Sequence, residues 1–137
     1  MSLVLDGSAT LAWVYPDETT PAIVAAFDRI LQNGAWVPEL WSVEVANALT
    51  MGVRRRRITA NERNEILTDL ALLPISIDRE TGKNAWARTI ELADAHLLSV
   101  YDATYLELAI RRMLPLSTLD SDLRRAAEAE GLTLLGI

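Results

Sequence analysis

The stretch that decides the fold is residues 3–8, Leu-Val-Leu-Asp-Gly-Ser, a short apolar run that ends in a turn signal. An apolar run of this length predicts a buried strand, and Asp-Gly-Ser predicts that the chain turns directly after it. Residues 116–120, Leu-Ser-Thr-Leu-Asp, have the same arrangement near the other end of the chain. Both runs therefore predict a strand that leads through an aspartate into the next element.

Between these two runs, short apolar stretches alternate with helical patterns. Besides 3–5 and 116–119, strands are predicted over residues 35–37, 75–77 and 133–135. Helices are predicted over residues 10–15, 21–34, 39–56, 59–73, 79–96, 99–113 and 120–130. Two of the helix starts, at Thr59 and at Ser99, match a capping box. This alternation predicts an α/β sandwich, with helices around a mainly parallel sheet of four or five short strands.

The composition limits the class of protein. The 137 residues are 50% hydrophobic and 23% charged, which fits one domain and excludes an intrinsically disordered chain. No apolar run reaches the roughly 18 residues that cross a bilayer, and the first residues lack the basic start of a signal peptide. We therefore expect a cytoplasmic protein with no membrane contact. With no cysteine and one histidine, His96, thiolate and multi-histidine centres are excluded, so any bound metal is held by oxygen.

The charge balance argues against non-specific binding of a polyanion. Thirteen basic residues stand against nineteen acidic ones, for a net charge of −6. Such a protein lacks long-range attraction for nucleic acid, which it could bind only through a local basic patch or through cations. The one basic run is Arg54-Arg55-Arg56-Arg57, at the end of the helix predicted over 39–56. Because cations are also favourable at a helix C-terminus, an RNA contact and a helix-end role both stay open.

Four acidic residues stand out by position. Asp6 and Asp120 follow predicted strands, Asp102 begins a predicted helix, and Glu44 lies on a helix that is apolar nearly all round. The first three also fit structural roles in turns and helix caps. Glu44 is expected to be buried, with Asn47 three residues further along the same face, and a buried carboxylate needs a partner. Because sites form at the carboxyl ends of parallel strands, these positions predict a site for a hard cation such as Mg²⁺ or Mn²⁺.

Four segments together resemble a known family. They are Val-Leu-Asp-Gly-Ser (4–8), Pro-Glu-Leu-Trp-Ser-Val-Glu-Val-Ala-Asn-Ala-Leu (38–49), Leu-Ser-Val-Tyr-Asp-Ala-Thr-Tyr-Leu-Glu-Leu-Ala (98–109) and Leu-Ser-Thr-Leu-Asp-Ser-Asp-Leu (116–123). In order and separation they resemble the PIN domain, and within it the VapC-type toxins of bacterial toxin–antitoxin pairs. The resemblance implies a PIN-like α/β/α sandwich and a single nuclease domain over residues 1–137.

The resemblance also implies roles for individual residues. Asp6, Glu44, Asp102 and Asp120 match the family's catalytic and metal-binding acids, and Ser8, Asn47 and Thr118 match its supporting polar residues. A role in a turn or first helical turn is favoured for Asp122 over a place in the metal site. His96 is isolated and is expected to be a helix-end residue.

The function implied by the resemblance is a Mg²⁺- or Mn²⁺-dependent endoribonuclease. Its substrate would be RNA (tRNA, rRNA or mRNA), its partner a cognate antitoxin protein, and its assembly a homodimer. One alternative is a PIN-fold module that binds RNA or protein without cutting it. A phosphoacceptor signalling domain is less favoured, because such a domain has a lysine after a late strand, whereas the only lysine, Lys83, follows the third one.

Overall fold

The computed structural model describes residues 1–137 and contains one five-stranded sheet with all neighbouring strands parallel. The strands are β1 (Leu3–Leu5), β2 (Ala35–Pro38), β3 (Ile75–Asp78), β4 (Leu116–Ser117) and β5 (Leu134–Leu135), in the order β3-β2-β1-β4-β5. In the register of the sheet, Val4 lies between Trp36 of β2 and Leu116 of β4.

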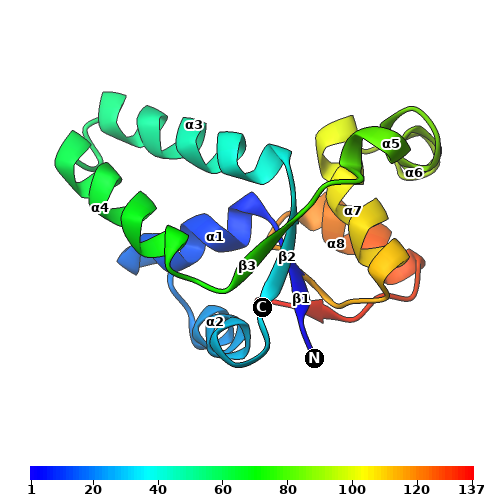
Figure 1. The fold of residues 1–137 in the computed structure, drawn as a ribbon, viewed down its shortest axis with the longest axis horizontal. Coiled ribbons are helices and arrows are strands. Elements are labelled where there is room, and N and C mark those ends of the chain that lie inside the picture. The colour runs from blue at the N-terminus through cyan, green and yellow to red at the C-terminus, as the bar shows by residue number, and fades with distance from the viewer.

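Helices cover both faces of this sheet (Figure 1). In Figure 1, the first four lie to the left of the strands and the last four to the right. They are α1 (Gly7–Val14), α2 (Pro21–Asn33), α3 (Leu40–Arg54), α4 (Ala60–Ala71), α5 (Thr81–Ala85), α6 (Arg88–His96), α7 (Val100–Arg112) and α8 (Ser121–Ala129), with a short 3₁₀ turn η1 (Pro16–Glu18). The expected α/β/α sandwich is confirmed. None of the helices combines the length and the apolar character needed to span a membrane.

The strand order reverses between β1 and β4. The chain builds outward from β1 through β2 to β3, and then returns to the other side of β1 to form β4 and β5. The N–H of Val4 donates to the carbonyl of Pro115 at 2.8 Å, and the N–H of Asp6 donates to the carbonyl of Ser117 at 3.2 Å. In open α/β sheets, ligands bind at the carboxyl ends of strands where the order reverses. Here that point is directly next to Asp6.

The core is continuous across the sheet. All three residues of β1 are completely buried, which fits a central parallel strand with helices on both faces. In α7, every residue from 103 to 109 is buried, so this helix is enclosed on all sides. On the other face, the rings of Trp13 and Phe27 stack with centroids 4.5 Å apart. The apolar residues of both layers belong to one cluster of 26 buried side chains.

Several boundaries differ from the sequence prediction. The first helix begins at Gly7 rather than at residue 10, because Asp6 accepts a hydrogen bond from the N–H of Ala9 and caps the helix. The strand predicted over 116–119 ends at Ser117, and the hydroxyl of Thr118 accepts the N–H of Asp120 beyond the strand. The capping box at Thr59 is present in full. At Ser99 only half of it forms: the serine accepts from the N–H of Asp102.

The helix predicted over 79–96 is two helices. It is interrupted at Trp86 and Ala87, and the tryptophan side chain is 92% exposed. No proline or glycine marks the break. None of the residues of α5 is buried, whereas α6 buries Thr89, Leu92 and Ala93. α6 is therefore anchored by buried side chains, whereas α5 is not.

The expectation that the Glu44 helix is buried on nearly all sides is wrong. In α3 only Trp41, Val45, Leu49 and Gly52 are buried, at the three- and four-residue spacing of a single helix face. Val43 is 72% exposed, and Glu44 is half-buried at the edge of the packed face. The outer face of α3 is thus not covered, and Val43 on it is left in solvent.

An ionic cluster holds the end of α7 against β3. Asp78 is completely buried and accepts hydrogen bonds from Arg111 at 2.8 Å and from Arg112 at 2.9 Å. Arg111 also bonds to Glu107 on its own helix, at 2.7 Å. The guanidinium of Arg112 lies 3.4 Å from the centroid of the Trp36 ring, at cation–π distance. These arginines therefore join α7 to the two strands β2 and β3.

Candidate functional site

Asp6 is the most constrained of the four acids. Its side chain is only 4% exposed. The oxygen Oδ1 accepts from the Ala9 N–H at 2.9 Å and from the Ser8 hydroxyl at 2.8 Å, while Oδ2 accepts from the Thr118 hydroxyl at 2.5 Å. Burial raises the pKa of Asp6 to about 6, although all three donors act to lower it. The carboxyl is therefore close to titrating at neutral pH.

The two hydroxyls beside Asp6 are oriented by backbone donors. Ser8 Oγ accepts from the N–H of Leu119 at 2.9 Å, and Thr118 Oγ1 accepts from the N–H of Asp120 at 3.1 Å. A hydroxyl has one proton. Because each oxygen already accepts a backbone N–H, its proton is left to point at Asp6. Two of the polar residues singled out from the sequence, Ser8 and Thr118, thus contact the first acid directly.

Asp120 lies at the start of α8, just after β4, and Thr118 links it to Asp6 at the end of β1. Asp120 Oδ1 accepts from the N–H of Leu123 at 2.8 Å, which is an N-cap bond. This bond occupies one carboxylate oxygen and leaves Oδ2 for another partner. Asp120 therefore has the predicted N-cap role, and its second carboxylate oxygen remains available to another partner.

Asp102 couples the four acids electrostatically. It lies in the first turn of α7, and burial raises its pKa, with a further increase from the negative charge of Asp120. In turn, the charge of Asp102 adds to the burial that raises the pKa of Asp6 and the pKa of Glu44. The charge of Asp102 is thus linked to that of each of the other three predicted acids, which come from three other parts of the chain.

Glu44 is held by a residue that the sequence analysis missed. Tyr105, which is 2% exposed, donates its hydroxyl proton to Glu44 Oε1 at 2.5 Å. Burial and the neighbouring Glu44 carboxylate raise the pKa of Tyr105, so that the phenol stays protonated and donates. Tyr105 lies three residues after Asp102 on α7, so the two share a helix face. That spacing is the signal by which it could have been found.

A second missed pair ties α3 to the first acid. The Thr10 hydroxyl donates to the carbonyl of Asp6 at 2.7 Å, and the indole N–H of Trp41 donates to the Thr10 oxygen at 3.0 Å. Both bonds are buried. Trp41 is three residues before Glu44 on α3. These two hydrogen bonds therefore help to fix the position of Glu44 relative to Asp6.

The remaining predicted residues lie further out. Asn47 is exposed beside Glu44. Asp122 lies in the first turn of α8, as favoured, and pairs with Arg125 at 2.9 Å. His96 ends α6 as expected, and its Nε2 lies 2.8 Å from a carboxylate oxygen of Glu130.

The four arginines of the basic run separate into two groups. Arg54, Arg55 and Arg56 are exposed at the end of α3. Arg57 instead pairs with Asp17 at 2.9 Å and with Glu18 of η1, and its guanidinium lies 3.6 Å from the centroid of the Tyr15 ring. The run therefore does not present one uniform cationic face.

The donor set fits a hydrated hard cation. The four acids offer oxygen ligands only, and they repel one another when ionised, which an ion would relieve. No three acidic or histidine side chains converge closely enough to enclose an ion by themselves. Mg²⁺ is commonly bound through one or two carboxylates while it keeps several waters. The donor set thus fits a cation that one or two of the carboxylates hold directly, with the others acting through water.

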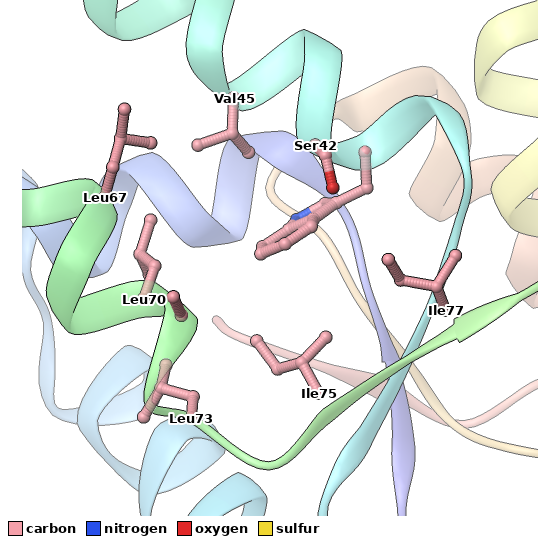
Figure 2. A pocket seen from close by; sticks show the side chains of 9 residues that line it. Ser42, Val45, Leu67, Leu70, Leu73, Ile75 and Ile77 are labelled. Atoms are coloured by element: carbon pink, nitrogen blue, oxygen red, sulfur yellow. The ribbon is translucent and has the colours of Figure 1, made fainter.

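An apolar groove lies away from the acids, between α3, α4 and β3 (Figure 2). It encloses about 320 Å³, and Figure 2 shows Val45, Leu67, Leu70 and Ile75 directed into it from these three elements. No charged residue lines it. Its chemistry suits an apolar side chain rather than a phosphate.

Comparison with known proteins places the chain in a family. Residues 3–129 match the PIN domain. The chain is 32% identical over 127 residues to Ribonuclease VapC3 of Pyrobaculum aerophilum, covering 90% of this chain and 92% of that protein. It shares its fold with FitAcB from Neisseria gonorrhoeae (TM-score 0.66, 16% identity, 98% of this chain and 96% of that one).

Two further solved structures have the same fold. VapBC2 from Rickettsia felis, bound to a DNA fragment from their promoter, gives a TM-score of 0.65 at 14% identity and covers 98% of this chain and 97% of that one. PAE2754 from Pyrobaculum aerophilum gives 0.64 at 18% identity, with 98% and 89% covered. The matched range contains Asp6, Glu44, Asp102 and Asp120. The chain therefore belongs to the PIN domain family, and within it to the VapC type.

Proposed function

We propose that this protein is a Mg²⁺- or Mn²⁺-dependent endoribonuclease, with residues 1–137 acting as one nuclease domain. The observation that carries the proposal is that Thr118 bonds both the Asp6 carboxylate and the Asp120 N–H where the strand order reverses, and that Asp102 is electrostatically linked to both acids. The similarity to Ribonuclease VapC3 supports RNA as the substrate. A bound cation supplies polarisation of water and phosphate oxygens and offsets the charge of the transition state.

The chain's own residues would hold and orient the reactants. Asp6 and Asp102 are the proposed direct ligands, and Asp120 contributes its free Oδ2. Tyr105 occupies Glu44 Oε1, so Glu44 Oε2 is left to orient the attacking water. Ser8 and Thr118 hold Asp6 in place through their hydroxyl protons.

The substrate backbone would extend along α3. Arg54 is ten residues from Glu44, which corresponds to about 15 Å along a helix. We propose that one or more of Arg54, Arg55 and Arg56, which are exposed, contact phosphates away from the cut. Arg57 was part of the predicted contact run, but its ion pairs with η1 give it a structural role that competes with RNA.

The activity is tested by cleavage of total RNA and tRNA by the purified protein with Mg²⁺ or Mn²⁺. We expect cleavage that is abolished by EDTA and by Asp6→Asn, and that survives in Asp122→Asn, whose exposed carboxylate pairs with Arg125. Cleavage at full rate by Asp6→Asn would refute the assignment. RNA binding without cleavage under either metal would instead identify the non-catalytic alternative.

We further propose that the protein is the toxin of a toxin–antitoxin pair, acts in the cytoplasm and forms a homodimer. The likeness to a VapBC complex supports an antitoxin partner. A small reading frame upstream of the gene would encode that partner. Co-purification of its product with this chain, and loss of RNA cleavage in the complex, test the pairing. Sedimentation of the isolated chain tests the dimer.

A further inference from the structure

A second hollow, called the recess below, lies directly beside the Glu44 carboxylate. It encloses about 360 Å³ and is lined by Leu40, Val43, Glu44, Asn47 and Tyr101. All but Tyr101 come from the first half of α3, and Tyr101 comes from the first turn of α7. The hollow is continuous with the proposed catalytic site, because Glu44 belongs to both and Tyr101 immediately precedes Asp102.

The lining combines exposed apolar surface with an unused amide. The side chain of Val43 is 72% exposed and that of Tyr101 is 66% exposed, so both would gain by covering apolar area. Leu40 packs on the core beneath them. The Asn47 amide is exposed, and no hydrogen bond ties it to the rest of the chain. An aromatic ring, two aliphatic side chains and a free amide therefore line one recess.

Resting on the ribonuclease function proposed above, we propose that this recess receives an unpaired nucleobase of the RNA, next to the phosphate that is cut. Proteins recognise single-stranded RNA by stacking its bases on aromatic rings and by hydrogen bonds to base edges. Tyr101 provides the ring, and Asn47 provides both donors and an acceptor for a base edge.

Charge favours a base over a phosphate in this position. Glu44 is the only charged residue in the lining. The lining has no basic side chain that could pair with a phosphate, whereas a neutral base needs none. The recess would thus bind the part of a nucleotide that the carboxylates do not bind, and it would hold the neighbouring phosphate at the acids. Cleavage would accordingly require an unpaired base beside the scissile bond.

The test is a double-mutant cycle between protein and substrate. The protein forms are wild type, Tyr101→Ala and Tyr101→Phe, and Leu72→Ala serves as a control that loses an exposed apolar side chain from the last turn before β3. The substrates are a single-stranded RNA and the same RNA with an abasic residue on either side of the cut. Because base–aromatic stacking is lost, we expect Tyr101→Ala to raise KM by roughly 5- to 150-fold, with a smaller change in kcat. Tyr101→Phe and Leu72→Ala keep the wild-type KM.

The abasic substrate identifies the contact. We expect an abasic residue on one side of the cut to raise KM for wild type and for Tyr101→Phe. For Tyr101→Ala, the abasic and the intact RNA should have the same KM. Equal KM for Tyr101→Ala and wild type, or an abasic effect of the same size in both, overturns the inference and leaves the ribonuclease proposal standing. A dimer that dissociates in Tyr101→Ala with KM unchanged also overturns it, and identifies the recess as a protein interface. A wild type that neither cuts nor binds RNA removes the proposed function and this inference together.

Discussion

The hydroxyl of Thr118 donates to Asp6 Oδ2 at 2.5 Å, and so joins the ends of β4 and β1 across 112 positions of the chain. The same oxygen accepts the N–H of Asp120. One side chain therefore sets the distance between two of the four acids and directs a proton at the more buried of them.

Removing that hydroxyl is expected to raise the pKa of Asp6 above its value of about 6, because Thr118 is one of the groups that lower it. Thr118→Val has a similar shape without the donor, and it also leaves the Asp120 N–H unpaired. Thr118→Ser keeps the hydroxyl and should keep the pKa. Titration of the Asp6 carboxyl carbon by NMR measures this, and an unchanged pKa in Thr118→Val would show that the bond is not important in solution.

Asp6→Asn is expected to stabilise the metal-free protein at neutral pH. The folded-state pKa is raised from 3.8 to about 6, so the ionised form opposes folding. The penalty is absent below about pH 4, grows as the pH rises through this interval, and is complete above pH 6. Two pKa units correspond to about 3 kcal/mol as an upper order of magnitude.

Urea unfolding at pH 4 and at pH 7.5 tests the direction of this effect, because it measures the free energy of unfolding of the variant relative to wild type. The variant should gain stability over wild type at pH 7.5 and lose that gain at pH 4. Asp122→Asn is the matched control, since its carboxylate is exposed and should have little effect at either pH. A stability of Asp6→Asn relative to wild type that does not rise between pH 4 and pH 7.5 would contradict the burial penalty, whereas a loss of equal size at both pH values would reflect the hydrogen bonds that the amide cannot accept.

Divalent cations are expected to raise the melting temperature of wild type and not that of Asp102→Asn. A ligand at about 100 times its Kd adds roughly 2.7 kcal/mol to the stability of the folded state. Because binding requires ionised carboxylates, the affinity should fall as the pH falls through about 6, by at most about tenfold per unit for one proton. Calorimetric titration with Mn²⁺ at pH 5.5, 6.5 and 7.5 measures it. A pH-independent affinity would remove Asp6 from the ligand set.

Asp78→Asn is expected to be strongly destabilising, by about 3 kcal/mol or more, because it leaves Arg111 and Arg112 around a neutral acceptor. Hydrogen bonds from these arginines outweigh burial and lower the pKa of Asp78. The stabilisation of the fold by ionised Asp78 is therefore complete above the unfolded-state pKa near 4, and it is lost as the pH falls below that value. Thermal unfolding of the wild type and the variant measures this, and the difference between their melting temperatures should be smaller at pH 3 than at pH 7.

Ser117→Ala is expected to leave stability unchanged or to increase it by up to about 1 kcal/mol. The Ser117 hydroxyl is completely buried and has no hydrogen-bond partner, unlike that of its neighbour Thr118. Removing an unpaired buried hydroxyl relieves a desolvation cost. Denaturant unfolding measures it, and a loss of more than 1 kcal/mol would mean that the hydroxyl has a partner in solution.

Local sequence patterns predicted the order and type of the strands and helices, except that the one helix predicted over 79–96 is two, α5 and α6. The run Leu3–Leu5 is apolar on both faces, which in a parallel sheet means a central strand, and the structure confirms it. The capping box at Thr59 needs only residues three positions apart, and it too forms as expected. Local patterns succeed where the interaction itself is local. They failed for α3, because a run of apolar residues does not reveal that its outer face has no partner.

How the four acids are positioned relative to one another depends on the tertiary structure. The Glu44–Tyr105 bond spans 61 positions and the Asp6–Thr118 bond spans 112, and no periodicity encodes a distance of that kind. The order β3-β2-β1-β4-β5 brings β4 against β1, and burial of α7 then carries Asp102 and Tyr105 to the same edge. The raised pKa of Asp6 follows from this packing, because desolvation depends on what surrounds a carboxylate in space and not on its neighbours in the chain.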